Sequence, residues 1–196
     1  MARTAEFDRQ EVLQRALDIF WQEGYCKCSV ARLVEATGLK PGSLYAAFGS
    51  KEGLFLAALE FYGRQSVRRL QACLDSADSP LQGIRTFIDQ IGERVLNREQ
   101  QRGCFLVNSV LEFSPGREAV NRVVETFFST IESLFVSALK KSAEAGELPP
   151  DQNPAALAKY LLVNIWGLQV LARTNPDEET VQAVLERIIA GLTASD

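Results

Sequence analysis

The chain has 196 residues, of which 46% are hydrophobic and 23% charged, and its net charge at pH 7 is −4. These proportions are typical of a soluble globular protein, and no apolar run approaches the roughly 20 residues of a membrane span. Residues 1–6 lack the hydrophobic core of a signal peptide, so we expect a cytoplasmic protein without a membrane partner. The four cysteines are then expected to be free thiols.

Helical patterns follow one another along the chain, without a convincing strand. Asp8 is expected to cap a first helix that ends at Gly24. Two short helices, over residues 29–37 and 40–48, are joined at Gly38, where the first must end in a left-handed residue. Pro41 opens the second of them, where its missing N–H costs nothing. This pattern predicts a helix-turn-helix, which sets its second helix into the DNA major groove.

The later helices are marked by their caps. Ser50 is expected to cap a long fourth helix over residues 51–75. Three later helices are expected to begin where a capping residue precedes a proline, at Ser79–Pro80, Asn153–Pro154 and Asn175–Pro176. Two more fit between Gly103 and Phe113 and between Gly116 and about residue 145. We therefore predict an all-α fold of about nine helices, with residues 1–50 as a three-helix DNA-binding head and residues 51–196 as a helical body.

The distribution of charge bears on DNA binding. Residues 1–51 contain seven Lys or Arg and six Asp or Glu, whereas residues 52–196 contain fourteen and nineteen. The acidity therefore belongs to the body, and contact with DNA is expected to be local, through a few placed cations and backbone N–H groups.

The head also resembles a known family. The motifs are Gly24-Tyr25, Ser29-Val30-Ala31, Gly38-Leu39-Lys40-Pro41-Gly42-Ser43-Leu44-Tyr45, Phe48 and Ser50-Lys51-Glu52-Gly53-Leu54-Phe55. As a set they look like the N-terminal signature of the TetR family of transcriptional regulators, over about residues 8–60. The resemblance implies an all-α homodimer that binds double-stranded DNA with its head and a small-molecule effector with its body, which also dimerises.

Candidate DNA contacts follow from chemistry and from this resemblance. Lys40 lies at the start of the recognition helix, where a long cation reaches a guanine edge or a phosphate. Ser43 and Tyr45 carry hydroxyls at positions where the family contacts phosphates. Lys51 combines its charge with the free N–H groups of the fourth helix. Ser29 either caps the second helix or contacts phosphate, and both interpretations stay open.

The recognition helix has a small-residue face. Pro41 and Gly42 complete the predicted DNA-binding set, because the backbone at Gly42 can approach DNA closely. Ala46 and Ala47 stand where many family members have bulky polar or aromatic residues, so the operator sequence does not follow from these residues. Arg32 is interpreted as a solvated surface arginine rather than a phosphate contact.

Cys104 is the candidate sensing thiol. A neighbouring cation, Arg102, and a helix N-terminus both favour a thiolate, which predicts a lowered pKa. Some TetR branches that respond to electrophiles or oxidants have a similar Gly-Cys pair opening this helix, here followed by Phe105 and Leu106. The alternative is that Cys104 is a small residue of the core.

An organic effector in the body is the other expectation. Phe105, Phe127 and Trp166 belong to its supply of aromatic side chains, and Asn108 interrupts an apolar helical face where a buried amide needs a partner. Plain core packing remains the alternative for each of them. No cofactor or metal is expected, since the chain has no histidine and the pair Cys26 and Cys28 has no third thiol nearby.

The last two expected helices carry apolar faces that predict a four-helix interface with a second copy. The residues are Leu157, Leu161, Leu162, Ile165, Leu168, Val181, Val184, Leu185, Ile188, Ile189 and Leu192.

The function predicted from these patterns is a repressor that binds a palindromic operator as a homodimer and is released by a small-molecule or thiol-reactive effector. An enzyme is not expected, because Ser-His and Cys-His pairs are impossible without histidine and no glycine-rich phosphate loop occurs. A helical adaptor that binds other proteins and never DNA is the alternative.

Overall fold

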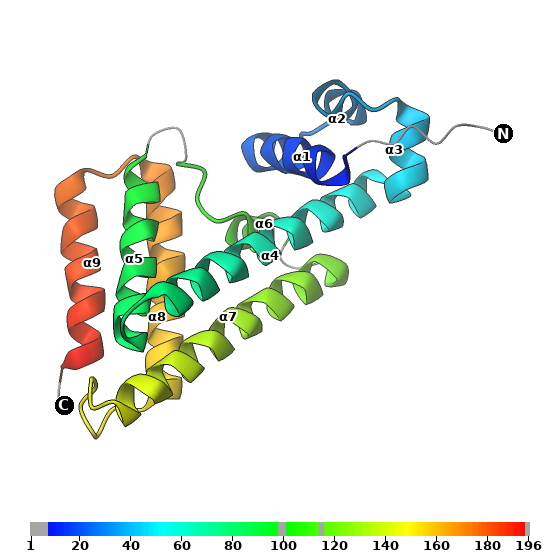
Figure 1. The fold of residues 1–196 in the computed structure, drawn as a ribbon. Coiled ribbons are helices and arrows are strands. Elements are labelled where there is room, and N and C mark those ends of the chain that lie inside the picture. Colours follow the sequence, from blue (N-terminus) through cyan, green and yellow to red (C-terminus); the bar gives the residue numbers. More distant parts are fainter. Residues whose placement is uncertain (1–7, 98–100, 114–115, 195–196) are drawn as a thin grey trace.

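The structure is a computed structural model that describes residues 8–97, 101–113 and 116–194, and these residues form helices and no strands (Figure 1). The helices are α1 (Arg9–Glu23), α2 (Val30–Thr37), α3 (Pro41–Phe48), α4 (Lys51–Ser76), α5 (Pro80–Leu96), α6 (Phe105–Phe113), α7 (Glu118–Glu144), α8 (Pro154–Leu171), a 3-10 turn (Ala172–Thr174) and α9 (Glu178–Thr193). The predicted all-α fold of nine helices is confirmed within the described residues.

Helices α1 to α3 form the head around a small apolar core. Phe20, Leu33 and Leu44 are fully buried there, one from each helix. Gly38 ends α2 with φ 70° and ψ 4°, and its N–H donates to the Val34 carbonyl. Thr37 fixes the turn from inside, since its hydroxyl donates to the Leu33 carbonyl at 2.6 Å and accepts from the Leu39 N–H at 3.4 Å.

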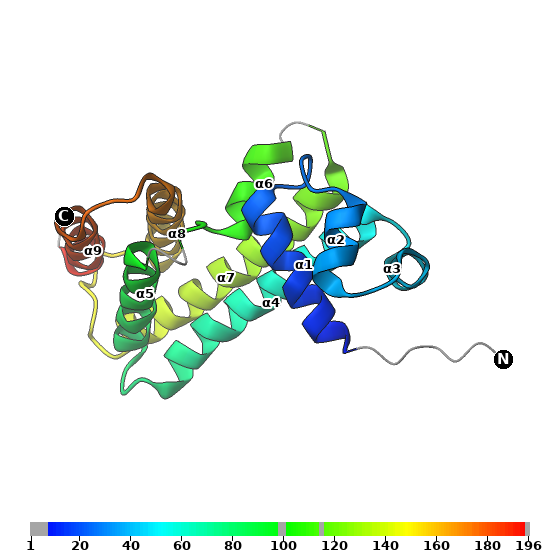
Figure 2. The same cartoon turned by 90° about the horizontal axis from the view of Figure 1, so that it is seen from above.

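Helix α4 joins the head to the body. It contacts α1 and α3 at its start and α5, α6 and α7 further along, and Figures 1 and 2 both show α7 running beside it. Leu54, Phe55, Ala58 and Leu59 of α4 are buried in the same cluster as the head residues. The division predicted at residue 50 therefore falls within a continuous core, which ties the position of the head to α4.

The helix caps were predicted well, with one exception. Ser79 and Asn153 cap α5 and α8, each followed by a proline in the first turn. The start predicted at Asn175–Pro176 is wrong, because Asn175 adopts a left-handed conformation with φ 54° and ψ 59°. Asp177 caps α9 instead, accepting from the Thr180 N–H at 2.7 Å. The chain after α8 continues through a 3-10 turn, so Asn175 ends that turn and the next carboxylate begins α9.

Most side chains predicted for the dimer face lie in the core of the single chain. The buried ones are Leu157, Leu161, Leu162, Ile165, Leu168, Val181, Leu185, Ile188 and Leu192, and the half-buried Val184 and Ile189 pack against them. The apolar faces of α8 and α9 thus hold these helices on α5 and α7, and the burial corrects their assignment to an intersubunit face. A different side of α8 stays open, with Val163 61% and Val170 45% exposed.

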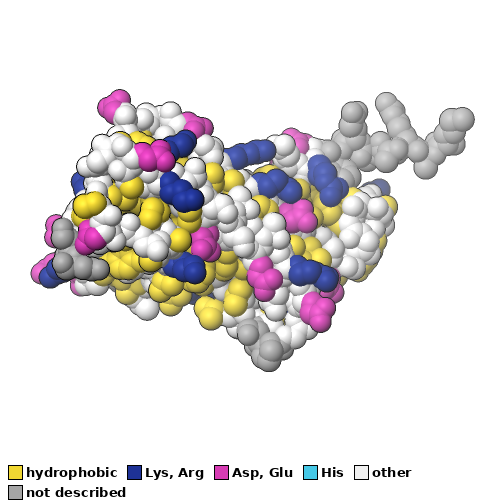
Figure 3. Space-filling model, turned by 90° about the horizontal axis from the view of Figure 1, so that it is seen from below, with side chains coloured by type: hydrophobic (Ala, Val, Ile, Leu, Met, Phe, Trp, Pro, Cys, Tyr) yellow, Lys and Arg dark blue, Asp and Glu magenta, His cyan; other side chains and the backbone are white. Residues whose placement is uncertain are grey.

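Helix α8 is apolar on more than one side, because it has both a buried face and the exposed Val163 and Val170. The segment Pro154–Thr174 has 21 residues and contains an 18-residue window with a mean hydropathy of 1.4, so it is long and apolar enough, by length and composition only, to cross a membrane. The statement from the sequence that no apolar run approaches span length is therefore wrong for this helix. Core helices of soluble proteins share these properties, and Leu161 and Leu168 pack α8 into the body. Figure 3 shows hydrophobic side chains gathered on the body half of the face seen from below.

Candidate nucleic-acid interface and body cavity

The recognition helix α3 is anchored by one side and open on the other. Leu44 is fully buried, whereas Lys40, Pro41, Gly42 and Tyr45 are exposed. Among the described residues, no hydrogen bond or ion pair occupies the Lys40 ammonium. The open side thus presents a cation and a phenol hydroxyl above a nearly flat backbone, which suits a phosphate-lined groove.

Ser43 and Ser29 flank this surface. Ser43 is half-buried on α3, and Ser29 is exposed at the start of α2. The Ser29 hydroxyl accepts from the Arg32 N–H at 3.1 Å, which makes it an N-cap. The capping interpretation of Ser29 is therefore realised, and a phosphate contact from it stays a prediction.

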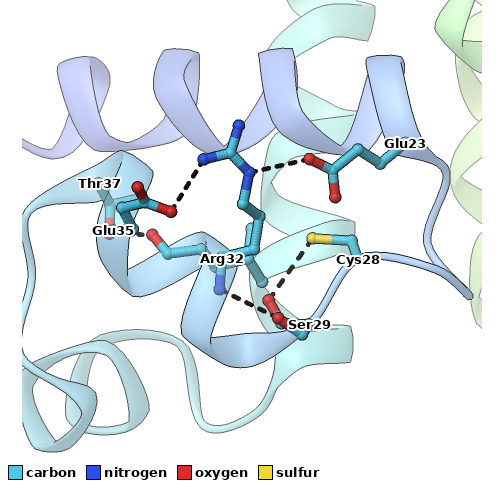
Figure 4. A network of polar contacts seen from close by, with 7 residues as sticks. Glu23, Cys28, Ser29, Arg32, Glu35 and Thr37 are labelled. Carbon is cyan, nitrogen blue, oxygen red and sulfur yellow. Dashed lines mark hydrogen bonds and ion pairs between the residues drawn. The ribbon is translucent and has the colours of Figure 1, made fainter.

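Arg32 is a surface arginine with a side chain 42% exposed, as the sequence suggested, and it also forms ion pairs that the sequence did not predict. Its Nε donates to Glu23 at 2.9 Å and its Nη1 to Glu35 at 2.9 Å, so the guanidinium lies between the end of α1 and α2 (Figure 4). The hydrogen bonds that Glu23 and then Glu35 accept from the guanidinium raise the pKa of Arg32. Glu35 belongs to α2, as Arg32 does, whereas Glu23 belongs to α1. The ion pair between Arg32 and Glu23 therefore connects α2 to α1.

The two cysteines of the head differ in exposure. Cys28 is buried, and its Sγ lies 3.7 Å from the Ser29 carbonyl oxygen (Figure 4). Burial, followed by the Glu23 charge, raises the pKa of Cys28. Cys26 is exposed. Within the described ranges, no group of three or more His, Cys, Asp or Glu side chains is arranged to hold a metal ion.

Lys51 has partners within the head, and a phosphate contact from it stays a prediction. Its ammonium donates to the Tyr25 carbonyl at 2.5 Å and lies 4.2 Å from the centroid of the Tyr25 ring. Arg117 also lies over this ring, at 4.5 Å, and pairs with Glu52 at 3.5 Å. Sequence reasoning missed this arrangement because the partner carbonyl belongs to the loop after α1, 26 residues away.

A cavity of about 370 Å³ lies where the head meets the body. Its wall is made by α1, α4, α5, α7, α8 and the segment that leads into α6. The volume falls within the range of small-molecule sites, near its lower end. Of the five predicted effector residues, Cys104 and Trp166 line the cavity.

The other three predicted effector residues lie outside the cavity wall. The Asn108 amide donates to the Arg102 carbonyl at 2.8 Å. Phe105 packs in an aromatic cluster, with its ring 5.4 Å from that of Phe55. Phe127 covers Gly63, where an added Cβ would lie 2.3 Å from its ring. These contacts fit the alternative of plain structural packing.

Cys104 differs from the expectation of a lowered pKa. Burial raises the pKa of this thiol, and this effect exceeds the lowering by the Val107 N–H, the Tyr62 hydroxyl and the Leu106 N–H. The helix N-terminus does act in the direction that the sequence suggested. The desolvation that outweighs it depends on α4, which the local sequence around Cys104 does not include.

Sequence reasoning also missed most polar residues of the cavity wall. Tyr62, Gln65, Ser66 and Arg69 all come from α4. The sequence did contain a signal for Arg69. This residue lies seven residues after Tyr62 and four before Cys73, so the three share one side of α4, and both Tyr62 and Cys73 are buried. A long cation on that side is a candidate lining residue of the body.

Comparison with known proteins agrees with this architecture. The family model described as "Bacterial regulatory proteins, tetR family" matches residues 12–58, and that described as "Tetracyclin repressor-like, C-terminal domain" matches residues 80–188. The HTH-type transcriptional repressor ComR of Escherichia coli (strain K12) is 30% identical over 183 residues, covering 93% of this chain and 87% of ComR.

Solved structures show the same fold. A cysteine mutant of the TetR family transcriptional regulator CifR, complexed with 26bp double-strand operator DNA, has a TM-score of 0.86 and 36% identity over 97% of this chain and 100% of that one. The reduced form of Escherichia coli NemR has a TM-score of 0.85 with 21% identity, over 96% of this chain and 97% of NemR.

Proposed function

The chain belongs to the TetR family of bacterial transcriptional regulators, and we propose that it represses transcription by binding a palindromic operator as a homodimer until an effector enters the body cavity. The observation that carries the proposal is the open side of α3, where Lys40 and Tyr45 are exposed while Leu44 anchors the helix. The CifR structures with operator DNA, at 36% identity, support the same use of the head.

The DNA contacts are assigned to the open surface around α3. Lys40 and Tyr45 supply a cation and a hydroxyl, and Pro41, Gly42 and Ser43 bring the backbone close to a phosphate. Lys51 acts through the Tyr25 loop, which it holds in place beside the helix-turn-helix. The first 50 residues then serve as the DNA-binding domain, and residues 51–196 bind the effector and dimerise.

The second copy is assigned to the open side of α8. Val163, Gly167 and Val170 recur there at helical spacing and are exposed in the single chain. Exposed Ala183 and Ala190 on α9 have the small size that close helix packing favours. Pairing of this surface about a two-fold axis places two heads on one operator, as a palindrome requires.

The cavity is assigned to the effector because the head and the body share its wall. Asp18 and Trp21 of α1 line it together with Arg69 of α4 and Trp166 of α8. Polar contacts also cross the junction beside the shared apolar core: the Trp21 Nε1 donates to the Arg102 carbonyl at 3.1 Å, and Arg102 pairs with Asp18 at 3.0 Å. A ligand in the cavity changes the contacts that set the angle of the head relative to the body. Regulation takes place in the cytoplasm, where the DNA is.

The experiment is selection of operator DNA from genomic fragments of the source organism. The purified protein is incubated with the fragments at low salt, and the retained DNA is sequenced. We expect a palindromic site next to a few genes, lost in a Lys40→Ala, Tyr45→Ala double variant and kept in Lys140→Ala, which changes an exposed lysine of α7. Retention of no specific sequence would refute the repressor and leave the protein-binding adaptor.

A further inference from the structure

The wall of the body cavity has a net positive charge, whereas the whole chain has a net negative charge. Arg69, Arg94 and Arg102 line it, and Asp18 is the one carboxylate among the described residues of the wall. The whole chain has a net charge of −4. Asp18 already pairs with Arg102 at 3.0 Å, so the charges of Arg69 and Arg94 remain without a carboxylate in the wall.

Arg69 is held in place without being neutralised. Its Nη2 donates to the Ser66 hydroxyl at 2.9 Å, and its guanidinium carbon lies 5.8 Å from the centroid of the Tyr62 ring. Both partners are neutral. Across the described residues, no ion pair involves Arg69 or Arg94.

The two arginines also act on each other. Burial lowers the pKa of Arg69, and the charge of Arg94 lowers it further. A desolvated cation that faces a second cation across one cavity without a counter-ion is unfavourable, and a bound anion relieves both the burial and the repulsion.

Part of the wall is apolar and aromatic. Phe87, Ile91, Phe128, Ile131 and Trp166 line the cavity, and the Phe128 and Trp166 rings lie 4.5 Å apart. A cavity of about 370 Å³ holds about a dozen groups of the size of a water molecule. The space therefore fits a small molecule with one charged end and one apolar end.

Building on the proposed effector role of the cavity, we infer that the effector is a small organic carboxylate with an aromatic or branched apolar tail, whose carboxylate binds Arg69 and Arg94. A guanidinium offers paired N–H donors that match a carboxylate in geometry, and a charged acceptor roughly doubles the strength of such bonds. The apolar tail then lies against the Phe128 and Trp166 rings. A neutral molecule of the same shape leaves both arginines uncompensated.

The test compares acids with their amides, which have the same shape without the charge. The probes are phenylacetate, cinnamate and the branched 4-methylpentanoate, each beside its amide. Binding is followed by tryptophan fluorescence, because both tryptophans of the chain, Trp21 and Trp166, line the cavity. We expect at least one acid to bind about tenfold more tightly than its amide.

Matched variants assign the preference to the arginines. Arg94→Gln is expected to abolish it and Arg94→Lys to retain part of it. Arg68→Gln, which changes an exposed arginine next to Arg69 on α4, is expected to keep it fully. Thermal melting followed by circular dichroism shows that each variant is folded. Equal binding of acid and amide for all three pairs, no binding of any acid, or loss of the preference in Arg68→Gln as well would overturn the inference.

The same preparations separate this inference from the proposed function. The selected operator is titrated with protein in the presence of the acid and of the amide. An acid that binds in an Arg94-dependent way and releases the operator supports both statements. An acid that binds in that way without releasing the operator supports the anion site and refutes the effector role of the cavity.

Discussion

Lys40 and Lys51 lie at the two ends of α3, and replacing each by methionine is expected to affect different quantities. The Lys40 ammonium is exposed and, within the described residues, has no protein partner. Each phosphate neutralised by a protein contributes about 0.9 to the slope of log K against log salt concentration. A homodimer presents Lys40 twice, so Lys40→Met is expected to make this slope shallower by about 1.8.

Lys51→Met is the matched control, with the same change of side chain. Its ammonium donates to the Tyr25 carbonyl and lies over the Tyr25 ring. Loss of this charged hydrogen bond and of the cation–π contact is expected to lower the free energy of unfolding by about 1–3 kcal/mol. The salt slope is expected to stay unchanged.

The assay is fluorescence anisotropy of labelled operator DNA over about 50 to 200 mM salt, the range in which phosphate contacts change affinity most visibly. Urea unfolding of both variants gives the free energies. A shallower slope in Lys51→Met with an unchanged free energy of unfolding would show that its ammonium binds phosphate rather than Tyr25. An unchanged slope in Lys40→Met would refute the assignment of Lys40 to the DNA surface.

Three further predictions follow from buried and exposed groups. Thr37→Val leaves the buried Leu39 N–H without its acceptor, and urea unfolding is expected to show a loss of about 1–3 kcal/mol; an unchanged midpoint would refute the role of Thr37 in the turn. Since burial raises the pKa of Cys104, iodoacetamide at neutral pH is expected to label exposed Cys26 first, and the labelling rate of Cys104 is expected to keep rising above the pH at which an ordinary thiol is fully ionised. Mass spectrometry of the peptides measures both rates, and faster labelling of Cys104 at neutral pH would contradict the pKa direction. Val163→Glu places a charge on the open side of α8 and is expected to give monomers in sedimentation velocity. Lys159→Glu, at an exposed position one turn earlier, serves as the control. A dimeric Val163→Glu variant would place the interface elsewhere.

The helices and the turn of the head could be predicted because their causes are local. Gly38 ends α2 in a left-handed conformation, and Ser79 caps α5, as their sequence neighbourhoods indicate. The error at Asn175 arose where two capping residues stand two positions apart. Local sequence offers both Asn175 and Asp177 as caps, and only the 3-10 turn after α8 decides between them.

The roles of individual charged residues could not be predicted in this way. Lys51, Arg32 and Arg102 were each visible as cations, but each has a partner from another helix or loop, which for Arg32 is Glu23 of α1. Arg102 pairs with Asp18, which is 84 residues away. The pKa of Cys104 likewise depends on burial against distant helices, whereas the sequence shows only the favourable helix start. Side-chain partners are therefore set by tertiary packing, and the cavity could not be placed before the fold was known.

The position of the cavity couples ligand binding directly to the position of the head. Its wall includes Asp18 and Trp21 of α1, and α1 also supplies Phe20 to the core that holds the helix-turn-helix. A ligand shifts the equilibrium between two head positions only by the difference in its affinity for them. Asp18 and Arg102 join α1 to the body in the cavity wall, so a carboxylate bound to Arg69 and Arg94 lies in the same cavity as this ion pair and moves the head if it binds more tightly to one position of α1. Coupling then needs no chain of intermediate residues through the body, since one side of the binding site is already part of the DNA-binding head.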